Sequence, residues 1–178
     1  MNAALRLLRV LFLALALAPV SALAEGPVDA AFRDAIAAFA AARPHLGAVA
    51  DGVDVAAYGD ALGGRRFASA YWGGVVEMAV EERLEATGSC SRFAAFVRMP
   101  PENGVVALVL CPEFSTPGAD SLRRLTILHE LVHVVAGPDE CRAMSFAARI
   151  ERLAFGHATP VERYWRANGC ERSGLRAP

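Results

Sequence analysis

The stretch from Leu125 to Val135 constrains this chain most, because it places two histidines and a glutamate within an apolar run. The run reads Leu-Thr-Ile-Leu-His-Glu-Leu-Val-His-Val-Val and predicts a helix. Residues four apart on a helix lie about 40° apart around its axis, one turn along, so His129 and His133 should project from the same face. Two imidazoles placed in this way can share one zinc ion. Burying both histidines without such a partner would be unfavourable.

Residues on either side predict where this helix begins and ends. Asp120 or Ser121 is expected to cap its start, since short oxygen-bearing side chains accept hydrogen bonds from the first backbone N–H groups. Gly137, followed by proline, should end it. Asp139 is then expected to cap a second helix that Gly156 ends. A turn this short between two helices can fold the second helix back across the first.

The rest of the chain predicts an α+β fold in one domain. Apolar spacing predicts a helix over 28–43 that Pro44 ends, and a last short helix over about 161–167. Frequent glycines in 46–74 predict turns between short strands, one of them at 67–72, and 75–84 fits a strand or a helix. The apolar runs 93–99 and 105–110 flank Asn103-Gly104, which predicts a β-hairpin.

The first 24 residues have the pattern of a secretory signal peptide. Arg6 and Arg9 precede an apolar segment over 10–20, and Ser21-Ala22-Leu23-Ala24 offers a small-residue cleavage site. We expect cleavage after Ala24, which leaves residues 25–178 as a secreted or periplasmic domain with no membrane association. The alternative is an uncleaved anchor, although the apolar segment is short for a membrane span.

The four cysteines fit an oxidising compartment, where an even count favours two disulfides. Cys90 and Cys111 flank the open end of the predicted hairpin, so we expect them to pair, which leaves Cys141 with Cys170. A structural zinc site built from cysteines is the alternative, although no pair has the two-residue spacing typical of one. The net charge of −1 has no basic surplus of the kind that nucleic-acid binding needs. We expect a monomer.

A catalytic zinc ion has three protein ligands and one open position, so a third ligand must lie outside the motif. Glu140 is our first choice, because it follows the Gly-Pro turn directly at the start of the second helix. Asp139 is the neighbouring alternative, although its position suits capping. Glu151 is a more distant alternative and is expected on a solvated helix face.

The motif His129-Glu130-Leu131-Val132-His133 resembles that of the zincin metallopeptidases. Asp139-Glu140-Cys141-Arg142-Ala143 is similar to the Asn/Asp-Glu-x-x-Ala pattern of gluzincins, in which the glutamate is a ligand. Gly137-Pro138-Asp139-Glu140 resembles the Gly-Thr-x-Asp pattern of aspzincins, with Pro for Thr and Glu for Asp. A metzincin-like spacing would instead make Asp139 the ligand. The resemblance covers only the motif and the residues that follow it, and it implies a small zincin-like metallopeptidase domain.

This resemblance implies hydrolysis of peptide or protein substrates with Zn²⁺ held by His129, His133 and Glu140. Glu130 would be the general base that takes a proton from water and delivers it to the leaving amine. Three side chains are candidates for stabilising the oxyanion: Tyr164, His157 and Arg142. The hairpin offers a strand edge for an extended peptide. The alternative is a non-catalytic secreted binding or structural module with a degenerate or stabilising zinc site.

Overall fold

The computed structural model describes residues 25–178 and has the predicted α+β fold. The expected signal peptide lies outside the described residues. Among residues 25–178, no helix combines the length and apolar character that crossing a membrane requires.

The N-terminal part contains two helices and a two-stranded sheet. Its elements are α1 (Pro27–Ala42), a 3₁₀ turn (Arg43–His45), β1 (Val49–Ala50), β2 (Val53–Asp54) and α2 (Val55–Gly64). The sequence predicted α1 but missed α2, because glycines punctuate this helix. Asp54 caps α2 by accepting hydrogen bonds from the N–H groups of Ala56 and Ala57. Gly59 lets α2 approach α1, since a Cβ there would lie 2.9 Å from Cε1 of Phe39.

Four strands form the larger sheet in the order β3-β4-β6-β5. They are β3 (Arg66–Ser69), β4 (Gly74–Glu82), β5 (Ala95–Glu102) and β6 (Val105–Leu110). β4 and β6 are parallel, and the other pairs are antiparallel. The segment that fitted either a strand or a helix is therefore strand β4, and the strand predicted over 67–72 ends at Ser69. The predicted hairpin is confirmed: Asn103 and Gly104 both have positive φ, as a two-residue hairpin turn requires.

The C-terminal half is helical, as predicted. It contains α3 (Asp120–Ala136), α4 (Glu140–Phe155), α5 (Glu162–Ala167) and a 3₁₀ turn at Cys170–Arg172. Two further 3₁₀ turns, Gly88–Ser91 and Pro112–Ser115, lie before and after the β5–β6 hairpin. The predicted cap of α3 is wrong. Ala119 occupies the N-cap position without a side-chain hydrogen bond, and the carboxylate of Asp120 pairs with Arg123 instead.

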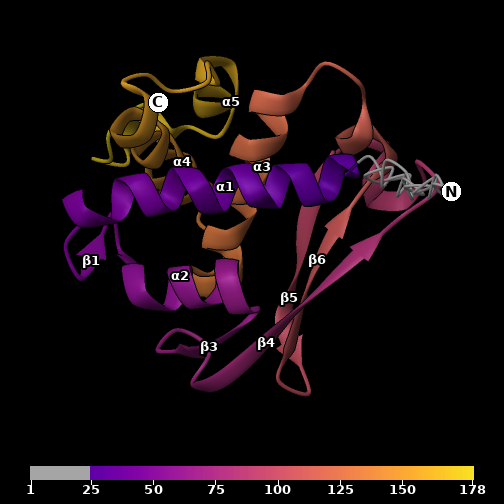
Figure 1. The fold of residues 1–178 in the computed structure, drawn as a ribbon, viewed down its shortest axis with the longest axis horizontal. Coiled ribbons are helices and arrows are strands. Elements are labelled where there is room, and N and C mark those ends of the chain that lie inside the picture. The colour runs from indigo at the N-terminus through magenta and orange to yellow at the C-terminus, as the bar shows by residue number, and fades with distance from the viewer. Residues whose placement is uncertain (1–24) are drawn as a thin grey trace, which may run out of the picture.

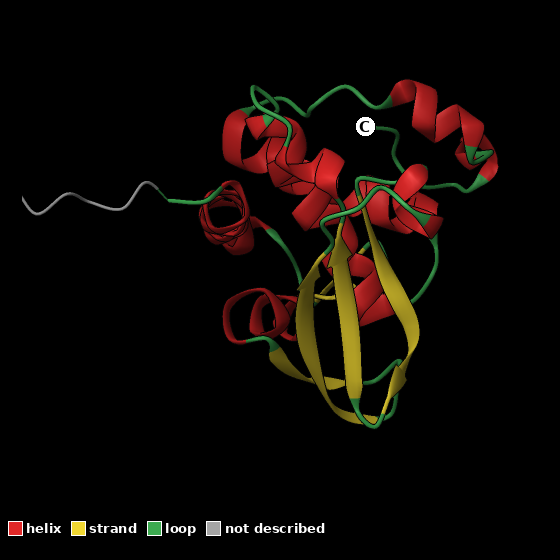
Figure 2. Ribbon diagram, turned by 90° about the vertical axis from the view of Figure 1, so that its right-hand side faces the viewer, coloured by secondary structure: helices red, strands yellow, loops and turns green. Residues whose placement is uncertain are grey.

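Helix α3 lies at the centre of the core. Leu128, Leu131 and Val132 are fully buried, because α1, α2, α4 and the sheet all pack around this helix. In Figure 1 the indigo helix α1 crosses the orange helix α3, and β4, β5 and β6 run together at one side. Figure 2 shows the strands grouped together, with most of the helices beside and above them. The helix that carries the motif is therefore held from several directions.

Both predicted disulfides are present. Cys90–Cys111 joins the segment before β5 to the residue after β6, and Cys141–Cys170 ties the first turn of α4 to the segment after α5. The alternative of a cysteine zinc site is therefore excluded, since the two bridges together use all four cysteines.

Candidate metal centre

Two hydrogen bonds from distant aromatic residues fix the C-terminal half of α3. The buried hydroxyl of Tyr58 donates to the carbonyl of Leu128 at 2.8 Å, and the indole N–H of Trp72 donates to the carbonyl of Val134 at 2.7 Å. The second bond satisfies one of the last four carbonyls of the helix, which have no partner within it. Both bonds restrict the rotation of the helix segment that carries the two histidines.

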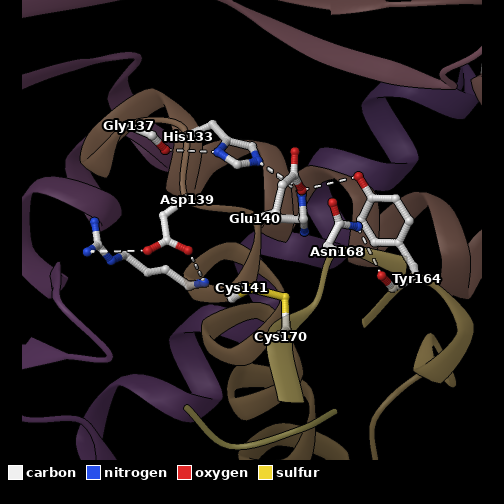
Figure 3. A network of polar contacts seen from close by, with 10 residues as sticks. His133, Gly137, Asp139, Glu140, Cys141, Tyr164, Asn168 and Cys170 are labelled. Atoms are coloured by element: carbon white, nitrogen blue, oxygen red, sulfur yellow. Dashed lines mark hydrogen bonds and ion pairs between the residues drawn. A yellow bond between two sulfur atoms is a disulfide. The ribbon is translucent and has the colours of Figure 1, made fainter. Parts of the chain in front are cut away.

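The turn after α3 fixes the orientation of His133. Nδ1 of His133 donates to the carbonyl of Gly137 at 2.9 Å, which leaves Nε2 facing the other polar groups of the site (Figure 3). Gly137 has φ 82° and ψ −166°, a conformation that is essentially restricted to glycine. A carbonyl bond of this kind selects the tautomer and ring orientation of metal-binding histidines.

Three side chains bring their ligand atoms together within 4.8 Å: His129, His133 and Glu140. The Nε2 atoms of the two histidines are 3.1 Å apart. Oε2 of Glu140 lies 3.1 Å from Nε2 of His129 and 3.6 Å from Nε2 of His133. Ligands about 2.05 Å from a tetrahedral zinc ion are separated by roughly 3.3 Å. The two nitrogens and one oxygen therefore fit three corners of such a site.

Charge couples the three groups. Burial opposes ionisation of Glu140, but its hydrogen bonds with His129 and His133 outweigh that effect and hold its pKa well below the usual range. Burial likewise opposes protonation of His133, but the hydrogen bond that its ring donates to the Glu140 carboxylate and the charge of Glu130 raise its pKa overall. Glu140 is therefore held as a carboxylate beside two imidazoles, an arrangement that favours a cation among the three groups.

Asp139 does not join this cluster. Its side chain accepts a hydrogen bond from the N–H of Arg142 at 3.0 Å, so it caps α4 as the sequence predicted. Figure 3 shows Asp139 and Glu140 extending in different directions from the start of the helix. Of the two neighbouring candidates for a third ligand, the structure brings only Glu140 to the histidines.

Glu151, the remaining candidate ligand, is also engaged elsewhere, and the expectation of a solvated position is wrong. Its carboxylate is buried and accepts hydrogen bonds from Arg124 at 2.7 and 3.0 Å. It also accepts bonds from the N–H and hydroxyl of Thr159 at 2.7 and 3.1 Å. The carboxylate therefore connects α3, α4 and the segment before α5. The basic partner is distant in sequence, so helical spacing alone did not reveal this role.

Glu130 lies beside the cluster without being part of it. Glu130 is 8% exposed. Burial raises the pKa of its carboxyl group, although the charges of both histidines act to lower that pKa. Glu130 and His129 both line a pocket of about 320 Å³. A carboxylate with a raised pKa at the edge of a pocket suits proton transfer.

Tyr164 is the only one of the three oxyanion candidates at the cluster. Its hydroxyl donates to Oε2 of Glu140 at 3.2 Å, and its ring also lines the pocket. Burial and the charge of Glu140 raise the pKa of Tyr164 to about 12, so its hydroxyl remains a donor at neutral pH. His157 is exposed and contacts the carbonyl of Phe155, while Arg142 donates to the carbonyl of Ala136.

Sequence reasoning missed three residues that support the site. Trp72 and Gly137 orient α3 and His133, and Glu151 holds the segment that leads to α5. The only signal in the sequence was the glycine that ends α3, because a glycine at this position commonly has positive φ.

Comparisons with known proteins identified no relative of this chain. No protein-family model, curated protein or solved structure matches the chain. The interpretation of the site therefore rests on its residues and their geometry.

Proposed function

We propose that the protein is a secreted or periplasmic zinc metallopeptidase of the zincin type, acting on peptide or protein substrates. The observation that carries the proposal is the convergence of His129, His133 and Glu140, with separations of 3.1, 3.1 and 3.6 Å between their ligand atoms. These three residues would hold the metal, and two imidazoles with one carboxylate suit zinc. The two disulfides fit an oxidising compartment.

A bound zinc ion supplies Lewis acidity, which polarises a substrate carbonyl and lowers the pKa of a water molecule. Side chains of the protein itself transfer the proton that this water molecule releases. Glu130 takes it up at its buried carboxylate and later delivers it to the departing amine. The Tyr164 hydroxyl donates to the carbonyl oxygen as negative charge develops there. Both residues line the same pocket as His129, which supports this division of roles.

Strand β5 offers a way to hold the substrate backbone. Among residues 25–178 it is the last strand in the sheet order, and its partner there is β6 along one edge. Ala95, at the start of β5, lines the pocket beside Glu130. An extended peptide that forms hydrogen bonds along this edge would pass the cluster in a defined direction.

The alternative is a binding module in which a metal only stabilises the fold. The buried Glu130 favours the enzyme, because a stabilising site with three ligands has no need for a second carboxylate beside a pocket. Turnover of an unfolded protein substrate by the chain lacking residues 1–24 tests the proposal. We expect activity that chelation abolishes and that one equivalent of zinc restores. Zinc binding without turnover would favour the module.

A further inference from the structure

The pocket beside Glu130 continues along α3 as a groove. A second pocket of about 170 Å³ shares three lining residues with the first: Ala94, Leu122 and Thr126. Leu122, Thr126 and His129 are spaced i, i+4 and i+7, so they form one stripe on α3. The two pockets are therefore neighbouring parts of one groove between this stripe and the segment that leads into β5. We call it the α3 groove.

Most of the surface around the larger pocket is apolar. Phe93, Leu122, Leu125, Met144 and Val161 line it, and His129 and Glu130 are among its polar lining residues. The hydroxyl of Thr126 donates a hydrogen bond to the carbonyl of Leu122 within the same helix, so this polar group already has a partner. The guanidinium carbon of Arg92 lies 5.4 Å from the centre of the Phe93 ring, so the charged group covers part of that ring.

Apolar side chains remain exposed at the mouth of the groove. Leu122 is 50% exposed and Phe93 is 40% exposed, although both face the pocket. Covering such side chains is favourable by about 25 cal/mol for each Å² removed from water. An apolar ligand group that enters here would cover them and at the same time lie beside Glu130 and His129.

The helix sets the length of the groove. From His129 to Leu122, seven residues of helix rise by about 10 Å, which matches about three residues of extended chain at about 3.3 Å each. The second pocket lies further toward the start of α3, where Phe114 and Ala119 line it. It has about half the volume of the first, which suits a smaller side chain.

We propose that the α3 groove binds about three residues of substrate on one side of the scissile bond, with a bulky apolar side chain in the larger pocket. This inference rests on the proposed peptidase function, since it assigns the substrate class of the same site. A substrate side chain such as Phe, Leu or Met lies next to the bond that is cleaved, and a smaller side chain follows in the second pocket.

Peptide binding tests this without requiring turnover. The zinc-loaded Glu130→Gln variant is titrated with fluorescent six-residue peptides that carry either Phe or Ser at the third position. We expect at least about tenfold tighter binding of the Phe peptide, because the pocket removes the apolar surface of such a side chain from water. Trimming one end of the Phe peptide, and not the other, should weaken its binding. Equal binding of both peptides overturns the inference.

A matched pair of variants then locates the binding. In the Glu130→Gln background, Leu122→Gln should abolish most of the preference for Phe. Leu153→Gln is the control, because Leu153 is another helix leucine, 37% exposed, and lines neither pocket. It should leave the preference unchanged. Equal effects of the two variants would place the binding elsewhere and overturn the groove assignment.

Hydrolysis of the same peptides by the wild-type protein separates the two proposals. Selective binding without cleavage contradicts the peptidase function and leaves an apolar peptide-binding groove. Cleavage without preference for the apolar residue contradicts the groove assignment and leaves the peptidase function intact.

Discussion

Tyr164 donates a hydrogen bond to Oε2 of Glu140, the same oxygen that lies 3.1 Å from His129. The two residues belong to different helices, and the Cys141–Cys170 disulfide connects the segments that carry them. Figure 3 shows this bridge next to the start of α4, with Tyr164 facing Glu140. One covalent link therefore restrains the distance between a candidate metal ligand and a candidate oxyanion donor.

Tyr164→Phe should lower kcat about 10²- to 10³-fold, the usual effect of removing one oxyanion donor. KM and zinc affinity should change little, since the ring that lines the pocket remains. Steady-state kinetics combined with zinc titration separate these effects. An unchanged kcat at full zinc occupancy would contradict the donor role and leave Tyr164 as a residue that only orients Glu140.

Glu140→Gln should weaken zinc binding by at least about tenfold, because an amide oxygen is a poorer ligand for zinc than a carboxylate. Asp139→Asn is the matched control, since asparagine can still accept the hydrogen bond from Arg142 that caps α4. Zinc titration of the two metal-free variants measures the difference. Loss of zinc in Asp139→Asn instead would support the metzincin-like ligand spacing.

Glu130→Gln should retain the fold and the zinc but lose about 10²- to 10⁴-fold in turnover, the range that general-base catalysis contributes. The amide keeps the size of the side chain and cannot take up the proton. Zinc content, thermal unfolding and peptide hydrolysis are measured on the same preparation. Full activity of this variant would exclude the proposed mechanism.

Gly137→Ala should destabilise the protein by about 1–3 kcal/mol, because the backbone at Gly137 adopts a conformation that alanine strongly disfavours. A Cβ there would also meet the ring of Tyr71. The carbonyl that orients His133 should move, so zinc affinity falls as well. Denaturant unfolding and zinc titration are the measurements. Gly156→Ala, at the end of α4 and distant in sequence from both histidines, is the control and should leave zinc affinity unchanged.

Zinc affinity should fall as the pH drops, and the fall should begin above the pH typical of an unperturbed histidine. The pKa of His133 is raised from 6.5 in the metal-free protein, and the ligand form is the neutral imidazole. A proton therefore competes with zinc up to a higher pH than usual. Competition with a chelator from about pH 5.5 to about pH 8 measures this dependence. An affinity that is independent of pH over this range would contradict the prediction.

The sequence by itself determined the features that depend on neighbouring residues. Gly137 and Asp139 predicted the boundary between α3 and α4, Asn103-Gly104 predicted the hairpin turn, and the hairpin in turn predicted the Cys90–Cys111 bridge. Helical spacing also placed His129 and His133 on one face. These inferences succeeded because backbone preferences and side-chain spacing act over a few residues.

Only the tertiary structure decided which groups join the histidines. Helix α2 contains glycines, and one of them, Gly59, allows the ring of Phe39 on α1 to pack closely against the helix. This packing could not be predicted from the sequence near α2. Glu151 is buried because Arg124 on another helix neutralises it, and Tyr164 reaches Glu140 only through the fold of α5. Asp139 and Glu140 are adjacent carboxylates with similar chemistry, and the sequence left both open. The choice between them depends on the direction in which α4 leaves the turn, which the packing of α4 against α1 and α3 sets.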